Sequence, residues 1–144
     1  MTAHPALAAV PSSVVEVFAD IACPYAHVGL RRFLARRTEI RRPDLVLRVR
    51  AWPLELVNGQ PLDVDHVAAV IDDLRSEVSP GLFTGFDTSS FPSTTLPALE
   101  LVGDAYRLSL TSGERASLAV RDALFEHGRD IGDPGARRPD PRSN

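Results

Sequence analysis

The fold of this chain is decided by residues 14–33, VVEVFADIACPYAHVGLRRF. The first six residues, Val14–Ala19, are apolar except for Glu16, and three of them are valines. Such a run predicts a strand that is covered on both faces, as parallel sheets require. Pro24 suits the first position of a helix, where its missing N–H would have no partner. The stretch therefore predicts a strand, a short turn over residues 20–23 and a helix.

The predicted helix runs from Pro24 to about Glu39, and a second strand over residues 45–52 follows it. Arginines gather at the end of the helix, where the helix dipole favours cations. Alternate residues of the second segment are apolar, which is typical of an edge strand. Strand, helix and strand predict a right-handed βαβ unit. The apolar residues that support the helix and the second strand are Ala26, Leu30, Phe33, Leu34, Ile40, Leu45, Leu47, Val49 and Ala51.

Helices are predicted for most of the chain after the second strand. Asp63 can cap the first of them, and residues 79–93 form a long connection with three phenylalanines, which favour a small satellite core. A third helix covers about residues 95–109. The spacing of Thr111 and Glu114 predicts a capping box at the start of a fourth helix, which ends near Gly128. The stripes expected to face inward are Val64, Val67, Ala68, Ile71, Leu74 and Val78, then Leu99, Val102, Ala105 and Tyr106, then Ala116, Ala119, Val120, Ala123 and Leu124.

Composition points to one globular domain. The 144 residues carry a formal charge of -3, with 44% hydrophobic and 24% charged residues. We expect a flexible N-terminus over residues 1–13, a domain over 14–131 whose helical part starts at about residue 63, and a disordered tail over 132–144. No apolar run has the length of a membrane span. One cysteine and no signal-peptide pattern favour a cytoplasmic location.

Cys23 is the principal candidate for chemistry. It follows an apolar strand and precedes a helix, so the positive end of the helix dipole should favour its thiolate form. His27 lies four residues later on the same helix face and could hydrogen-bond the thiol or carry a proton. The alternative is that Cys23 is a small buried apolar residue, as free cysteines commonly are. Position alone does not choose between them.

The residues around Cys23 resemble a known active site. Residues 18–33 resemble the active-site segment of the DsbA-like branch of the thioredoxin superfamily, which includes disulfide oxidoreductases and hydroxychromene-carboxylate isomerases and has a strand, Cys-Pro-aromatic-Cys, and a helix. Residues 52–61, WPLELVNGQP, resemble the segment after that family's second strand. The helical stretch to about Asp133 resembles its inserted helical subdomain. The resemblance implies an α/β, thioredoxin-like fold with a helical insertion.

Two departures from the family pattern change what the resemblance implies. Ala26 stands where the family has its second, resolving cysteine, so only a one-thiol route is left. The family continues into a cis-proline loop, two further strands and a last helix, for which the sequence has no counterpart, so the resemblance implies a C-terminally truncated member. The first strand should then have one open flank, through which we expect self-association.

The expected function is therefore monothiol disulfide exchange. Cys23 attacks, His27 assists, Pro24 and Tyr25 contact the substrate, and a small cellular thiol, which is not a bound cofactor, resolves the adduct. Two alternatives stay open: a small-thiol-dependent isomerase or transferase of the same fold, and a non-catalytic fragment or binding domain. Nucleic acid and membrane partners are not expected, because the arginines of residues 31–50 suit a solvated helix end. No metal is expected, because His4, His27, His66 and His127 lack ligand spacing.

Overall fold

The computed structural model describes residues 12–132, which form a mixed α/β unit. Strand β1 (Val14–Ala19), helix α2 (Pro24–Glu39) and strand β2 (Val46–Ala51) follow one another. The strands are parallel, with Val14 opposite Val46 and Ala19 opposite Ala51. The predicted βαβ order is confirmed, and each element lies within a residue of its expected bounds. Among the described residues the sheet has two strands.

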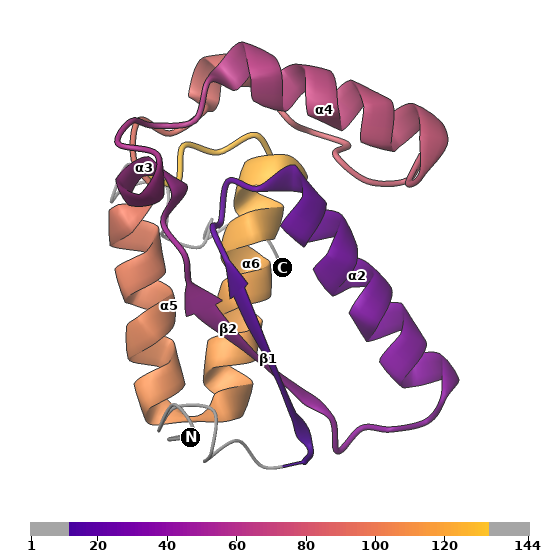
Figure 1. The fold of residues 1–144 in the computed structure, drawn as a ribbon. Coiled ribbons are helices and arrows are strands. Elements are labelled where there is room, and N and C mark those ends of the chain that lie inside the picture. Colours follow the sequence, from indigo (N-terminus) through magenta and orange to yellow (C-terminus); the bar gives the residue numbers. More distant parts are fainter. Residues whose placement is uncertain (1–11, 133–144) are drawn as a thin grey trace, which may run out of the picture.

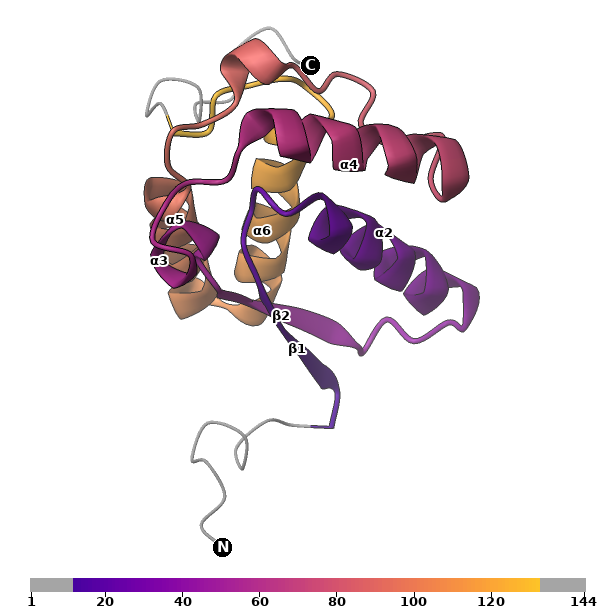
Figure 2. The ribbon, with the colours of Figure 1, turned by 45° about the horizontal axis from the view of Figure 1, so that its top comes forward.

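Helices make up the rest of the unit. They are α3 (Leu54–Val57), α4 (Val64–Glu77), the short 3₁₀ helix η1 (Thr88–Ser90), α5 (Leu96–Leu108) and α6 (Leu110–Phe125). In Figure 1, α2 and α5 lie on opposite sides of the strands, and α6 lies next to the strands and is joined to α2 by the Arg31–Asp122 and Arg37–Glu114 ion pairs. Helix α4 lies beside the N-terminal end of α2, as both views show (Figure 2). This end of the unit is also where β1 leads into α2.

Two apolar clusters stabilise this arrangement. The larger joins α4, α5, α6 and the loop after β1, and Phe83, Leu124 and Phe125 are completely buried in it. Phe86 and Phe91 pack against the same cluster, as expected for the loop of three phenylalanines. In the smaller cluster, α2 covers one face of the sheet, where the most buried members are Ala19, Leu30, Leu47 and Val49.

The other face of the sheet is only partly covered. Phe18 is 54% exposed and meets Trp52, itself 49% exposed, edge to face. Glu16 and Arg50 form an ion pair across the two strands. The prediction that the first strand is covered on both faces therefore holds only in part, because Val14 is buried on this face whereas Phe18 is exposed on it.

The free edge of β2 is closed by side chains of the α5–α6 hairpin. The Tyr106 hydroxyl accepts a hydrogen bond from the Val49 N–H and donates one to the Leu47 carbonyl, both at 2.9 Å. The Glu114 carboxylate accepts from the Leu47 N–H at 2.8 Å and pairs with Arg37. An edge strand that would otherwise offer unpaired donors is thus satisfied within the chain.

The start of α6 differs from its prediction. Ser109, not Thr111, is the N-cap, and its hydroxyl accepts from the Ser112 N–H. Glu114 contacts β2 and Arg37 instead of completing a capping box, because an acceptor is needed at that strand edge. The helix ends at Phe125, before Gly128.

The buried faces of the helices differ from several expected stripes. Ala119 is exposed, whereas Ser117 and Arg121 are buried, so the inward face of α6 is rotated towards two polar residues. Ile40 and Val78 lie just beyond their helices and are exposed. Asp63 caps α4 as predicted, since its carboxylate accepts from the N–H groups of Asp65 and His66.

The predictions for the chain ends lie largely outside the described residues, which exclude 1–11 and 133–144. Within the described part of the chain, no helix combines the length and apolar character needed to cross a membrane.

Candidate active site around Cys23

The turn that presents Cys23 is held by Asp20, which follows β1 and is only 3% exposed. Its carboxylate accepts hydrogen bonds from the Leu54 N–H at 2.7 Å, the Thr95 hydroxyl at 2.8 Å and the Ala22 N–H at 3.3 Å. These donors come from the start of α3, the start of α5 and the turn itself. One buried carboxylate thereby fixes three segments, and with them the position from which α2 begins.

Cys23 is the N-cap residue of α2, with φ −82° and ψ 112°. Its side chain is partly exposed, its thiol is free, and among residues 12–132 it makes no capping hydrogen bond. Because Pro24 occupies the first helical turn, one backbone donor that would lack a partner there is absent. Cys23 therefore lies at the positive end of a 16-residue helix and is not buried in the core.

The two expected substrate contacts differ in accessibility. Tyr25 is 63% exposed beside Cys23, so its ring is available to a partner. Pro24 is buried beneath the same turn, where its part is structural. The sequence places both residues next to the thiol, but only the Tyr25 side chain offers a broad exposed surface.

His27 lies in the core, away from solvent. It is 1% exposed, and its ring packs against Phe83 and Phe125 at centroid distances of 5.3 and 4.9 Å. Its Nε2–H donates to the Glu126 carboxylate at 3.0 Å. Among residues 12–132 no hydrogen bond joins the His27 ring to the Cys23 thiol; the helical bond from the His27 N–H to the Cys23 carbonyl, at 3.2 Å, is a backbone contact.

Burial determines the protonation of this pair. Burial lowers the pKa of His27 below its ordinary value, and the nearby Glu126 carboxylate only partly offsets that effect. Burial alone would raise the pKa of Glu126, but the Phe83 N–H and the His27 ring reverse the effect and lower it. A neutral imidazole donating to a carboxylate follows at neutral pH. Glu126 thus connects α2, the loop at Phe83 and the end of α6.

Arg121 is the residue near this turn that the sequence analysis missed. It is 1% exposed on α6, and its guanidinium donates to the Ser117 carbonyl at 3.0 Å and to the Asp20 carbonyl at 3.2 Å. Burial lowers the pKa of Arg121, and the negative charge of the nearby Asp20 carboxylate only partly offsets that effect. The available signal was its position one turn after Ser117, between Val120 and Leu124 on an apolar stripe.

Among the described residues, no group of three or more His, Cys, Asp or Glu side chains is placed to hold a metal ion. His66 and His127 are both exposed.

Comparisons with models of protein families, with curated proteins and with solved structures find no match for this chain. The candidate site therefore depends on the geometry described above.

Proposed function

We propose that this chain has a thioredoxin-like fold related to the DsbA-like branch and carries out thiol exchange through Cys23 alone. The observation that carries the proposal is a partly exposed, free cysteine at the N-cap of α2, one short turn after a parallel strand. This placement leaves a sulfur accessible at the positive end of a helix dipole, a position in which reactive cysteines occur. A reducing compartment such as the cytoplasm would keep the thiol free.

The reaction needs one cysteine and an external thiol. The Cys23 thiolate attacks one sulfur of a disulfide substrate, the S–S bond breaks, and the second sulfur leaves as a thiolate that takes a proton from water. A small cellular thiol, as thiolate, then attacks the mixed disulfide and releases Cys23. In this scheme His27 is a positioning residue, because its ring N–H is held by Glu126.

The test compares the native chain with the same chain unfolded in denaturant. Reaction of Cys23 with a small aromatic disulfide should be about tenfold faster in the native state, because only the folded chain has the α2 dipole beside the sulfur. Equal rates for the native and the unfolded chain would contradict the proposal. Cys23→Ser is the control that accounts for background reaction.

A second variant tests the thioredoxin-like geometry of the turn. Ala26 is the third residue of α2, so Ala26→Cys places two thiols on the first helical turn, within the roughly 7 Å between Cα atoms that a disulfide requires. We expect an internal disulfide. The reduced pair should cleave one equivalent of a disulfide substrate without an added small thiol, after which a reductant is needed to restore both thiols. Ala35→Cys, at an exposed position later in α2, is the matched control and should form no internal disulfide.

One observation favours a second candidate, a non-catalytic binding domain. Within the described residues β1 has a strand neighbour on one side only, so its outer edge is available for pairing. Turnover of a disulfide substrate excludes this candidate, whereas an unreactive Cys23 with concentration-dependent association supports it. Turnover of a small electrophile that is not a disulfide, and only in the presence of the added thiol, would instead identify the isomerase or transferase alternative.

A further inference from the structure

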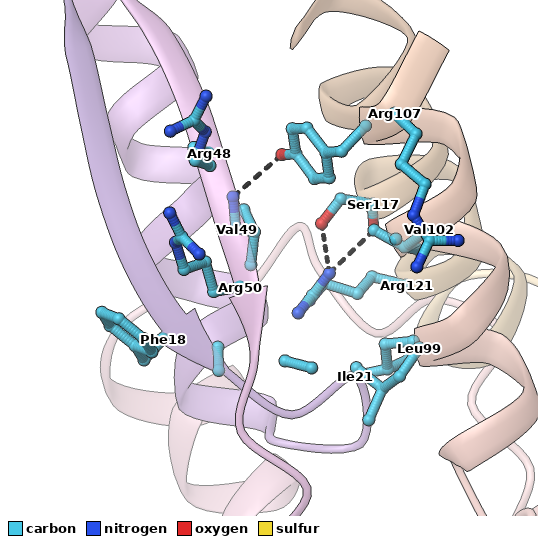
Figure 3. Close-up of a pocket in the computed structure, with 14 residues that line it drawn as sticks. Phe18, Ile21, Arg48, Val49, Arg50, Leu99, Val102, Arg107, Ser117 and Arg121 are labelled. Atoms are coloured by element: carbon cyan, nitrogen blue, oxygen red, sulfur yellow. Dashed lines mark hydrogen bonds between the residues drawn. The ribbon is translucent and has the colours of Figure 1, made fainter. Parts of the chain in front are cut away.

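A hollow rich in arginine lies between the sheet and the α5–α6 hairpin. Its volume is about 580 Å³, within the range of small-molecule sites. Four of its lining residues are arginines: Arg48 and Arg50 on β2, Arg107 on α5 and Arg121 on α6. The walls in Figure 3 are β2 on the left and the two helices on the right. All fourteen lining residues belong to the described part of the chain, and none is acidic.

The positive charge of this hollow is only partly neutralised by neighbours. Arg50 pairs with Glu16 and Arg107 with Asp104. Within residues 12–132, neither Arg48 nor Arg121 forms a salt bridge with a carboxylate. The guanidinium groups of Arg48 and Arg121 therefore line the hollow without a salt bridge to a described carboxylate.

Arg121 is the most informative of the four, because it is a buried cation that forms no salt bridge among residues 12–132, and the charge of the nearby Asp20 carboxylate only partly offsets the effect of burial. Its side chain is 1% exposed, and its Nε–H has no hydrogen-bond partner within the described part of the chain. Burial lowers the pKa of Arg121 to about 10, so the group remains charged at neutral pH. An anion in the adjoining hollow would offset this charge across a short, poorly hydrated distance.

The remaining lining is largely apolar. Ile21, Leu99 and Val102 are buried residues that form part of the wall beneath the arginines. A ligand with an apolar body and an anionic group would satisfy both kinds of surface, whereas an inorganic anion would leave the apolar part unfilled. A nucleic acid strand needs a long charged groove, and this hollow is small.

We propose that the hollow binds a small organic anion, such as an aromatic carboxylate, with its charged group among the guanidinium groups of Arg48, Arg107 and Arg121. The body of the ligand lies against Ile21, Leu99 and Val102. Cys23 is not among the lining residues, so this site stands independently of the thiol chemistry.

The test is a titration of the full-length, ¹⁵N-labelled chain with benzoate, followed by the amide signals of Val49, Gly103 and Ser117. Benzyl alcohol, with the same ring and no charge, is the matched ligand and should bind about tenfold more weakly. Added salt should weaken benzoate binding. Cys23→Ser should bind benzoate with unchanged affinity, so a failure of the thiol proposal is recognised separately.

Variants distinguish a built site from general attraction to a cation. Arg48→Gln should weaken benzoate binding about tenfold, and so should Arg107→Gln, which also serves if the first variant misfolds. Arg32→Gln is the matched control, because Arg32 is exposed on α2 and does not line the hollow. Equal binding of benzoate and benzyl alcohol would overturn the proposal. So would an equal loss in Arg32→Gln, or shifts confined to amides outside the hollow.

Discussion

Gly113 on α6 provides the sharpest test of how the hairpin closes the sheet. A Cβ built on Gly113 would overlap the Cγ, Cδ1 and Cε1 atoms of the Tyr106 ring, so Gly113→Ala must displace that ring. The same ring carries the hydroxyl that bonds the Leu47 carbonyl and the Val49 N–H. The substitution should therefore disturb α5–α6 packing and the edge of β2 together.

The expected magnitude follows from three contributions. Overpacking typically costs about 2 kcal/mol of unfolding free energy. Loss of the two Tyr106 hydrogen bonds destabilises the chain by about 1 kcal/mol each. Alanine in place of glycine within a helix stabilises it by about 1 kcal/mol. Gly113→Ala should thus destabilise the chain by about 3 kcal/mol. In a Tyr106→Ala background the clash and both bonds are already absent, so the same change should stabilise it by about 1 kcal/mol.

The assay is urea denaturation, followed by circular dichroism, of four proteins: wild type, each single variant and the double variant. The sign reversal corresponds to a coupling energy of about 4 kcal/mol between the two positions. Gly29→Ala in α2 is the matched control, because a Cβ there would have no neighbour within 4 Å. It should stabilise by about 1 kcal/mol. If Gly113→Ala also stabilises the wild type, the Tyr106 ring does not pack against Gly113 as the structure shows.

Two further predictions concern the buried histidine and the open sheet edge. Burial lowers the pKa of His27 below its ordinary value of 6.5, so the unfolded state binds a proton more readily than the folded state. The free energy of unfolding should therefore fall as the pH drops below 6.5. His27→Gln should remove this part of the pH dependence in urea denaturation, and an unchanged slope would mean that another group titrates. The outer edge of β1 should support self-association, and a charged side chain on an edge strand opposes such pairing, so replacing the exposed Phe18 in Phe18→Lys should lower the mass measured by light scattering at high concentration. A wild-type chain that stays monomeric throughout would contradict this expectation.

The local elements of the fold follow from sequence patterns. The apolar run Val14–Ala19 and the alternation over residues 45–52 predict β1 and β2, because a strand's exposure repeats every two residues. Pro24 and Asp63 mark the starts of α2 and α4 through backbone chemistry confined to one turn. The place of Cys23 at a strand-to-helix turn was therefore predictable.

The partners of the buried polar groups were decided only by the tertiary structure. The pattern placed His27 near Cys23, but its ring binds Glu126, 99 residues away. Arg121 reaches the Asp20 carbonyl, 101 residues away, and Tyr106 closes a strand edge in place of filling a simple apolar stripe. Local periodicity reports which side of a helix is apolar. It does not report which distant donor or acceptor a buried polar group will meet, because that depends on how the helices pack once the chain has folded.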